Sequence, residues 1–561
     1  MGVKGALSRL DAKWLVILGS VGVLVIFVVV PMVYLVINSF IVDGVVDFDN
    51  YKTVYSKIVN WEALMNTFKL SLLVMILSLI ISFPLAWLVG RTNMPGKGFF
   101  RTTFVATYMI PPYVGAIAWT QLLNPSVGFV NTMLVHMFNL SSSPFNIYSM
   151  GGLVWVLTLF YSPFAFITIS RALEKMDPTL EEAARISGAS PLRALCDVTL
   201  PLMFPSILAG GLLVFIAAGS CFGIPSIVGM PAQIEVLTTR IVTYVYMGDS
   251  KGIRDATALA VSLMLVANSI LFFMTMMLGK KDYVTIGGKS TRPNIVDLGV
   301  WKWAAVAVAV TYGLVTVFLP IASIFVSSLI KTYSQPINLS NLTFENWLPV
   351  IQSSQFIVPI KNSFITATAA ATISTVIAVF VSYLAIKTRA KGRFIPDVLS
   401  TLGGATPSVV IALALIITFS GNLGLNLYST LAILVVGYMV KYLTMSVRTI
   451  SASLSQVHAS LEEAALNSGA SWLRTCKDIM LPLIAPSIVA GWFLVFMPSF
   501  YELTMSIILY GAKTKTIGVL LYELQTYADP QSASVLSVLV LIIVLAGNLI
   551  IRKLTKGSVG I

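Results

Sequence analysis

Twelve stretches of the chain are apolar over about 20 residues, the length at which a helix crosses the hydrocarbon core of a bilayer. In lipid, every backbone N–H and C=O must find a partner within the protein, which restricts such spans to helices. The chain is therefore expected to be an all-α polytopic membrane protein. The expected spans cover residues 14-37, 63-90, 103-123, 150-170, 203-229, 256-278, 302-329, 362-386, 397-419, 428-448, 483-509 and 532-551.

The composition supports a membrane protein and indicates its orientation. Hydrophobic residues make up 57% of the chain and charged residues 11%, against about 25% charged in ordinary soluble chains. Lys and Arg outnumber Asp and Glu by 36 to 23, and most of them fall on one side if both termini are cytoplasmic, as the positive-inside rule requires. We interpret this excess as a topology signal and not as a nucleic-acid surface. The first span, from Trp14, lacks a cleavage site and is interpreted as a retained helix.

Residues able to support catalysis or hold a metal are scarce. The three cysteines show no CxxC spacing, and the chain has only two histidines, so no metal site, disulfide framework or catalytic centre is expected. The stretch Gly287-Gly288-Lys289-Ser290 resembles the end of a phosphate-binding loop, but Tyr283 stands where that loop needs glycine. If transport consumes ATP, the ATPase must be another polypeptide.

The two halves of the chain repeat one another in order. Short motifs recur at offsets of 281 to 296, and the differences fall in loops, where insertions are tolerated. Each half holds six expected spans, so the halves should be related by an axis along the membrane normal. We expect a first transmembrane half over 1-278, a basic cytoplasmic linker over 279-301 and a second half over 302-561. The matched motifs are Lys13-Trp14 with Lys302-Trp303, Phe48-Asp49-Asn50-Tyr51 with Phe344-Glu345-Asn346-Trp347, and Asn66-Thr67-Phe68 with Asn362-Ser363-Phe364.

The most similar repeated stretch is polar and lies between the fourth and fifth span of each half. It reads EEAARISGASPLRALCDVTLP from residue 181 and EEAALNSGASWLRTCKDIMLP from residue 462. Acidic residues near the start favour a helix, a glycine then breaks it, and Leu-Pro suits the first turn of the next span. A short helix, a break and a second helix would present a rigid knob to a cytosolic partner. Two such knobs indicate a partner with two-fold symmetry.

These stretches resemble the signature of permease subunits of binding-protein-dependent ABC importers, which is Glu-Ala-Ala, three residues, Gly, nine residues, and Ile-x-Leu-Pro. The second copy matches without departure, and the first has Val198 in place of isoleucine. The matching residues are Glu182-Ala183-Ala184, Gly188 and Leu200-Pro201 in the first copy, and Glu463-Ala464-Ala465, Gly469, Ile479 and Leu481-Pro482 in the second.

This resemblance covers nearly the whole chain and implies the type I importer fold, in the bacterial cytoplasmic (inner) membrane. It implies two copies of a cytosolic ATPase carrying ATP and Mg, an extracytoplasmic solute-binding protein, and one copy of this chain per transporter, which binds no cofactor itself. The loops 171-201 and 449-482 would be the coupling loops. Their ATPase contacts would come from Glu181, Glu182, Ala183, Ala184, Gly188, Ala189, Ser190, Glu462, Glu463, Ala464, Ala465, Gly469, Ala470 and Ser471.

A fused pair of halves looks most like ferric-iron permeases, and the stretch from Phe222 to Thr239 is similar to theirs. Related fused permeases serve thiamine, phosphonates and sugar phosphates, so these solutes remain alternatives. A duplicated secondary transporter is the alternative from another class, but it would not require the two matched loops.

Two charged residues within the spans are candidates for a solute path. Glu502 and Lys441 would each cost about 2.5–3.5 kcal/mol facing lipid at the centre of a span, so both should face protein or water. They either line the path or neutralise each other on consecutive spans. Tyr161 and Tyr442, which align at 281, could ligate iron or simply pack. Pro112 and Pro407 mark bends that either move or stay fixed.

Overall fold

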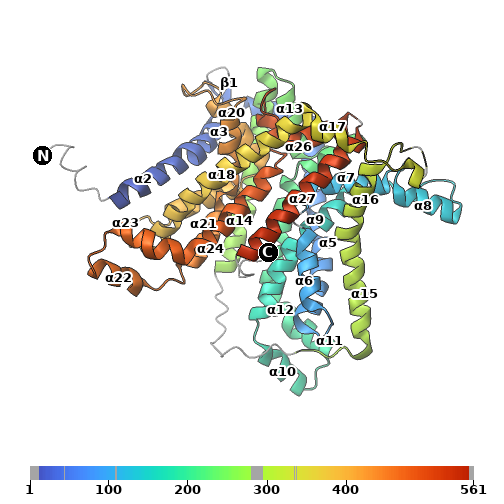
Figure 1. Cartoon of the computed structure of the whole chain (residues 1–561), viewed down its shortest axis with the longest axis horizontal. Coiled ribbons are helices and arrows are strands. Elements are labelled where there is room, and N and C mark those ends of the chain that lie inside the picture. The colour runs from blue at the N-terminus through green and yellow to red at the C-terminus, as the bar shows by residue number, and fades with distance from the viewer. Residues whose placement is uncertain are drawn as a thin grey trace.

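The computed structural model describes residues 12–554, except 43–44, 108–109, 280–294, 334, 336–337 and 528. Most of the described chain is helical, and loops join the helices (Figure 1). The described strands form one short antiparallel hairpin of β1 (Ile41–Val42) and β2 (Val45–Val46), in which Ile41 pairs with Val46. The linker prediction, 279-301, falls mostly outside the described residues.

The first half contains long membrane-length helices joined by short ones. The polar stretch at 181 forms α10, α11 and the π-helical turn η3, which runs into α12. The elements are α2 (Ala12–Leu24), η1 (Val25–Val29), α3 (Val30–Ser39), α4 (Asp49–Ser56), α5 (Ile58–Arg91), α6 (Lys97–Ala106), α7 (Pro112–Leu123), α8 (Phe129–Phe138), α9 (Met150–Lys175), α10 (Pro178–Ile186), α11 (Pro191–Ala194), η3 (Leu195–Thr199), α12 (Leu200–Ser220), η4 (Pro225–Gly229), η5 (Met230–Ala232), α13 (Leu237–Tyr246) and α14 (Ser250–Gly279).

The second half repeats this order without a counterpart of α8. Its elements are η6 (Gly299–Trp301), α15 (Lys302–Gly313), η7 (Leu314–Phe318), α16 (Leu319–Leu329), η8 (Leu339–Asn341), α17 (Trp347–Gln352), α18 (Ser354–Lys387), α19 (Ile395–Ala405), α20 (Ser408–Phe419), α21 (Leu431–Leu454), α22 (Ala459–Asn467), α23 (Trp472–Thr475), η9 (Cys476–Met480), α24 (Leu481–Phe500), α25 (Ser506–Leu509), α26 (Ile517–Thr526) and α27 (Pro530–Leu554).

Ten helical segments of the described chain are long and apolar enough to span a membrane, and a bent pair raises the number to eleven at most. The prediction of twelve continuous spans is therefore corrected at the third span of each half. The expected span 397-419 is α19 and α20, which meet at 107°, and the expected span 103-123 is α6 and α7 with a break between them. Proline explains both breaks, because Pro407 and Pro112 stand where the second helix of each pair begins.

The duplicated motifs have the same structural role in both halves. In the first half, Thr67 Oγ1 accepts a hydrogen bond from the backbone N–H of Leu237, at the start of α13 (2.8 Å). In the second half, Ser363 Oγ accepts one from Ile517 N, at the start of α26 (2.9 Å). A hydroxyl on the long helix thus satisfies a backbone donor that a helix start leaves unpaired, which explains why Thr and Ser occupy these repeat positions.

The first spanning helix of each half packs against the other half. Tyr312 on α15 forms a hydrogen bond with Ser162 on α9 (2.6 Å), and its ring meets Phe104 on α6 edge-on. In the reverse direction, Phe27 on η1 packs against Phe419 at the end of α20. The two halves therefore exchange their first helices, so the division at 279-301 describes the repeat in the sequence and not two separate packing units.

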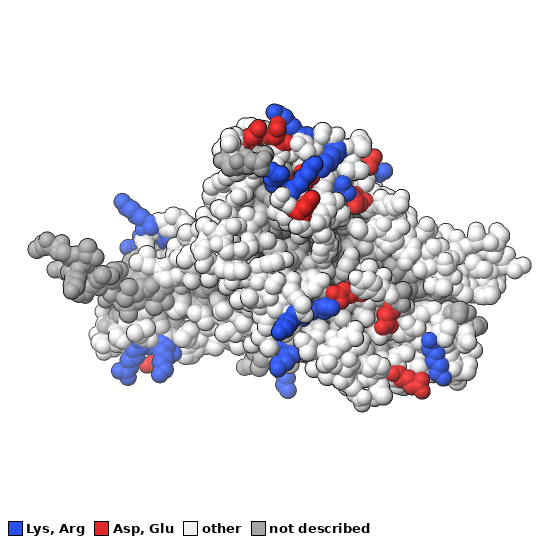
Figure 2. Space-filling view, turned by 90° about the horizontal axis from the view of Figure 1, so that it is seen from above, with Lys and Arg blue, Asp and Glu red and all other residues white. Residues whose placement is uncertain are grey.

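Uncharged surface separates the charged groups. Figure 2 shows Lys, Arg, Asp and Glu gathered in a few clusters with broad areas free of charge between them. Large apolar side chains are exposed along the spanning helices, as expected where a helix faces lipid. Examples are Ile76, Ile80, Phe204, Phe272 and Phe273.

Candidate functional site

The helices α10 and α22 carry the repeated polar stretch, and both end in the same way. Gly188 and Gly469 have φ of +91° and +84°, in the left-handed region that side chains disfavour. After α10, Gly188 N donates to Arg185 O and Ala189 N donates to Ala184 O, both at 3.0 Å, which is the Schellman pattern. After α22, Ala470 N donates to Ala465 O at 3.0 Å. The backbone conformation therefore requires glycine at these positions. Lack of space does not, because a Cβ added at either glycine would meet nothing within 4 Å.

The second helix of each loop is also built alike. Ser190 Oγ and Ser471 Oγ accept hydrogen bonds from Arg193 N and Arg474 N at 3.3 and 3.4 Å, the pattern of an N-cap. The two arginines then pair with acids one turn later, Arg193 with Asp197 and Arg474 with Asp478, each at 3.3 Å. Each loop is therefore a helix–glycine–helix knob of defined shape.

The N-caps of α10 and α22 differ in chemistry. Asp177 Oδ1 accepts a hydrogen bond from Thr179 N at 2.9 Å, and this backbone hydrogen bond lowers the pKa of the carboxyl below its usual value. At the matching position in the second half, His458 Nδ1 accepts from Ser460 N at 3.3 Å. A carboxylate therefore caps the first helix of the first knob, and an imidazole caps that of the second.

Two of the residues predicted to contact the ATPase also form hydrogen bonds that anchor the knobs. Glu181 is buried and accepts a hydrogen bond from Thr199 Oγ1 at 2.7 Å. Glu462 accepts one from Tyr383 OH on α18 at 2.5 Å, and Tyr383 OH also accepts from Trp472 Nε1 at 2.9 Å. Of the other predicted contact residues, Ala465 is buried, Ala184, Ala189 and Ala470 are half-buried, and Glu182, Ala183, Gly188, Ser190, Glu463, Ala464, Gly469 and Ser471 are exposed.

A basic residue fixes the chain just before each knob. Arg91, the last residue of α5, is buried and donates to the carbonyl oxygens of Leu173 and Met176 at 2.9 and 3.1 Å. Lys387, the last residue of α18, donates to Val457 O at 2.5 Å. Cations suit helix C-termini because they satisfy the last carbonyls. These contacts connect each knob to the longest helix of its half, and the sequence analysis did not find them.

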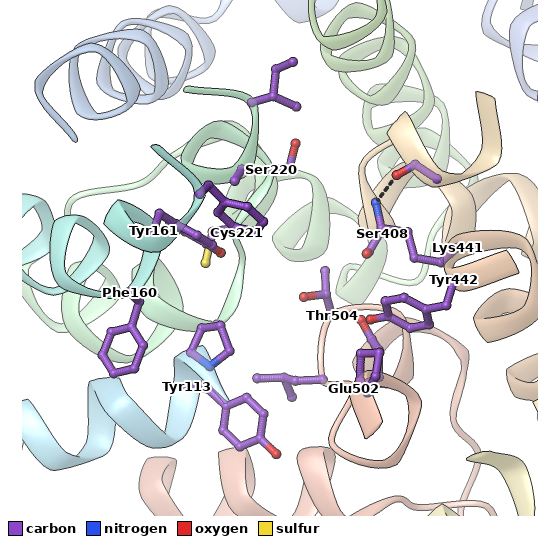
Figure 3. A pocket seen from close by; sticks show the side chains of 18 of the residues that line it. Tyr113, Phe160, Tyr161, Ser220, Cys221, Ser408, Lys441, Tyr442, Glu502 and Thr504 are labelled. Carbon is purple, nitrogen blue, oxygen red and sulfur yellow. Dashed lines mark hydrogen bonds between the residues drawn. The ribbon is translucent and has the colours of Figure 1, made fainter. Parts of the chain in front are cut away.

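A cavity of about 400 Å³ lies where the halves meet. Its walls include the segments that follow the fifth span of each half, and Gly223 lies so close to Leu503 that a Cβ at Gly223 would be 3.4 Å from it. Figure 3 shows the charged side chains on the wall formed by the second half, and Phe160, Tyr161 and Cys221 on the wall formed by the first. The polar and charged lining residues are Tyr113, Tyr161, Ser220, Cys221, Ser408, Lys441, Tyr442, Tyr501, Glu502 and Thr504.

The carboxylate of Glu502 is held by a tight turn. Its Oε2 accepts hydrogen bonds from Met505 N, Ser506 N and Ser506 Oγ at 2.8, 3.1 and 3.2 Å. No hydrogen bond joins its Oε1 to another described residue, although the side chain lines the cavity. One oxygen therefore builds the turn, and the other remains for water or a solute.

Backbone carbonyl groups hold the ammonium of Lys441. Its ammonium donates to Gly404 O and Thr406 O at 3.0 and 2.8 Å, at the break between α19 and α20. No ion pair joins the described side chains of Lys441 and Glu502. Both line the cavity, and their place on a solute path stays a prediction.

The other predicted path residues mostly reach this cavity. Tyr161, Tyr442 and Pro112 line it, whereas Pro407 stands behind it at the bend between two lining residues, Ala405 and Ser408. The other polar lining residues were not predicted; they are Tyr113, Ser220, Cys221, Ser408, Tyr501 and Thr504. Thr504 could have been found, because it lies within the turn of Glu502. Among the described residues, no group of three His, Cys, Asp or Glu side chains could hold a metal ion.

A protein-family model matches both halves. The family is described as "Binding-protein-dependent transport system inner membrane component", and it matches residues 82–281 and 374–556. Both matched ranges include a knob and the spans on either side, and both leave out the exchanged first helix.

Curated relatives carry permease names. The Fe(3+)-transport system permease protein FbpB 2 of Haemophilus influenzae is 27% identical over 82% of this chain and 84% of its own length. The ferric transport system permease protein FbpB of Actinobacillus pleuropneumoniae is 25% identical over 76% of this chain, which spans only 60% of that relative. The Escherichia coli molybdenum transport system permease protein ModB matches 37% of this chain at 26% identity.

Among solved structures, a bacterial alginate ABC transporter in complex with a pentasaccharide-bound periplasmic protein is similar to this chain. It covers 46% of this chain and 96% of its own chain, at 20% identity and a TM-score of 0.38. The matched family ranges extend over both halves and contain both helix–glycine–helix knobs. The chain is therefore a multi-pass membrane protein that belongs to the inner-membrane permease components of binding-protein-dependent ABC transport systems, with two permease halves fused in one polypeptide.

Proposed function

We propose that this chain is the complete membrane pathway of an ATP-driven importer for ferric iron. An extracytoplasmic binding protein delivers the solute, and the cavity between the halves passes it to the cytoplasm by alternating access. Two ATPase subunits, which carry the ATP and Mg, receive the knobs at α10 and α22. This arrangement places both termini in the cytoplasm and one copy of the chain in each transporter.

The observation that carries the choice of a cationic solute is the unequal use of the two charges in the cavity. Lys441 donates to two backbone carbonyls, whereas Glu502 keeps an oxygen that no described residue engages. A carboxylate in a low-dielectric cavity attracts a cation more strongly than it would in water. Ferric iron, which the names of relatives that match most of the chain give as their solute, is a cation that this carboxylate would attract. Molybdate, phosphonates and sugar phosphates are anions that it would repel.

Movement would come from the knobs, because each is joined to a spanning helix on both sides. Glu462 and Trp472 reach α18 through Tyr383, and Arg91 joins α5 to the end of α9. When the ATPase subunits approach one another, the knobs would move together and shift these helices. The two states differ in packing around the cavity, as a population shift requires.

Reconstitution tests the proposal. Proteoliposomes containing the chain, its ATPase and its binding protein should take up ferric iron when ATP is supplied, and collapse of the proton gradient should leave uptake unchanged. Uptake that stops with the gradient and continues without ATP would establish a secondary transporter. Efficient competition by thiamine, putrescine or molybdate would move the assignment to another solute.

A further inference from the structure

The loop between α7 and α9 carries a helix, α8, that only the first half has. The corresponding loop between α20 and α21, over residues 420–430, contains no helix. Residues 124–149, which include α8, contain no Lys, Arg, Asp or Glu. Figure 1 shows α8 projecting sideways beyond the spanning helices, and Figure 2 shows no charged side chain on this projecting end of the molecule. The surroundings of α8 must therefore suit an uncharged surface.

The side chain of Asn131 fixes the orientation of α8. It is buried, and its Nδ2 donates hydrogen bonds to Leu123 O, at the end of α7, at 3.1 Å and to Phe145 O at 2.8 Å. Its Oδ1 accepts one from Phe145 N at 3.1 Å. These bonds join α8 to the end of α7 and to the segment that leads into α9. Each exposed face of α8 therefore has a defined direction.

The exposed surface of α8 is divided into a polar and an apolar stripe. Thr132 and His136 are exposed one turn apart. Met133 and Met137, also one turn apart, are 53% and 64% exposed on the neighbouring side of the helix. A helix with two such stripes is suited to lie in the plane of a membrane surface. The apolar side chains that are exposed elsewhere in the segment are Val127, Phe138, Leu140 and Phe145.

Helix α9 sets the level of α8 relative to the bilayer. The end of α9 at Lys175 leads into the first knob, so its start at Met150, next to the α8 segment, lies on the opposite side of the membrane. The 26 residues of α9 extend over about 39 Å, which exceeds the hydrocarbon thickness of about 30 Å. Trp155, in the second turn of α9, is exposed and contacts Trp119 edge-on. Tryptophan is enriched at the membrane–water boundary, which places α8 close to that boundary.

Lipid suits the apolar stripe better than a protein that binds and leaves. A surface that is bare between binding events meets water, where a contiguous apolar patch favours aggregation. The lipid-facing surface of the spans also continues next to α8. Helix α7 contacts both α8 and α16, and Phe325 on α16 is exposed like the other lipid-facing apolar side chains. The bilayer is therefore the partner that the surroundings of α8 favour.

We propose that α8 is an interfacial helix, with Met133 and Met137 among the acyl chains and Thr132 and His136 toward the headgroups and water. Its place in the outer leaflet rests on the proposed function, in which the knobs are cytoplasmic, whereas the lipid contact does not. Because the segment has no Lys or Arg, apolar burial alone holds it in the leaflet. The helix anchors one end of α7, and the other end, at Pro112, lines the cavity. The bilayer thus fixes one wall of the cavity in the first half.

Spin labels on single cysteines compare the two stripes directly. The apolar stripe is labelled through Met133→Cys or Met137→Cys and the polar stripe through Thr132→Cys or His136→Cys, with serine in place of all native cysteines. The full chain, assembled with its ATPase in proteoliposomes, is studied by power saturation with O₂, which concentrates among acyl chains, and with a water-soluble nickel chelate. At the methionine positions the collision rate with O₂ should exceed that with nickel several-fold. At the polar positions the order should be reversed.

Two outcomes would overturn the proposal. One is a nickel rate that exceeds the O₂ rate at all four positions, because α8 would then lie in water. The other is a fall in the O₂ rate at the methionine positions when the solute-loaded binding protein is added, since the apolar stripe would then be its docking surface. The melting temperature of each labelled variant should match that of the unlabelled chain, because all four side chains are exposed. The collision rates require neither ATP nor uptake, so the proposal can fail while the proposed function stands.

Discussion

Lys441 donates a hydrogen bond to the carbonyl oxygen of Thr406 at 2.8 Å, at the point where α19 and α20 meet at 107°. The break frees backbone carbonyls that a continuous helix would have paired, and in an apolar environment such groups need a partner. The ammonium supplies it for Thr406 and for Gly404. The ammonium in this span therefore stabilises the bent backbone.

Lys441→Met should destabilise the protein. Both carbonyls would lose their donor, and an unsatisfied buried polar group costs about 1–3 kcal/mol. The free energy of unfolding in detergent, measured by denaturant titration, should fall by that order. Lys391→Met is the matched control, because Lys391 is exposed on a loop, and it should leave stability unchanged. Equal stability of the two variants would show that the break does not depend on the ammonium.

Glu502→Gln should remove the negative charge from the cavity while keeping the turn that the side chain holds. The amide oxygen of glutamine can still accept from Met505 N and Ser506 N, so the turn and the melting temperature should persist. Loss of the negative charge should lower ATP-dependent uptake of ferric iron by about tenfold, which corresponds to about 1.4 kcal/mol. Glu523→Gln, which removes a carboxylate paired with Lys515, is the control. Uptake at the wild-type rate in Glu502→Gln would exclude this carboxylate from the path.

The duplication and the knobs could be predicted from the sequence because they depend on local rules. Gly188 and Gly469 are required by a left-handed backbone, and Thr67 and Ser363 by donors at helix starts. The same or similar residues therefore recur at matched positions of the two halves, and this spacing can be seen in the amino-acid sequence.

The prolines indicated bends, but the size of the breaks and the exchange of helices could not be predicted in the same way. Hydropathy records contact with apolar surroundings, and α19 and α20 together are apolar enough to be taken as one straight span. The helices α13 and α26 were missed because they are only ten residues long and mostly buried. The packing of α15 on α6 depends on contacts far apart in sequence. An apolar pattern cannot show which half a helix will join.

Acidification should loosen the segment that leads into α15, where Val296 N donates to Arg91 O at 2.8 Å. Hydrogen bonds from Gly299 N and Asn93 Nδ2 lower the pKa of Asp297 below its usual 3.8. A lowered carboxyl pKa stabilises the folded contact above pH 3.8, and this contribution is lost as the pH falls through the lower, folded value. Cleavage by pepsin, which works in acid, should therefore rise over residues 295–301 in that pH range. In Asp297→Asn the cleavage should already be raised at pH 4 and should change little with further acid.

The glycine of each knob should be replaceable by asparagine but not by valine. Asparagine tolerates the left-handed region, while a β-branched residue there is a strong outlier. Adopting that conformation costs a non-glycine residue about 1–2 kcal/mol. Gly188→Val with Gly469→Val should therefore distort both knobs and abolish co-purification of the ATPase, whereas Gly188→Asn with Gly469→Asn should retain it. Retention in the valine pair would mean that the knobs are not the ATPase contact.

The two knobs should differ in how they respond to loss of one hydroxyl. Tyr383→Phe removes the donor to Glu462 and the acceptor for Trp472 Nε1, whereas Thr199→Val removes only the donor to Glu181. At about 0.5–1.5 kcal/mol for each hydrogen bond, Tyr383→Phe should loosen its knob about twice as much.

The measurement is the rate of solute-stimulated ATP hydrolysis in proteoliposomes, together with hydrogen exchange over residues 178–186 and 459–467. Tyr383→Phe should raise exchange in the second knob alone, and Thr199→Val in the first alone. Tyr55→Phe, which removes a hydroxyl bond to Ser262 away from both knobs, should change neither. Equal exchange in both knobs after Tyr383→Phe would mean that α18 does not hold the second knob by this contact. The loss of one local hydrogen bond can change the first knob only if the helices between the two knobs also move.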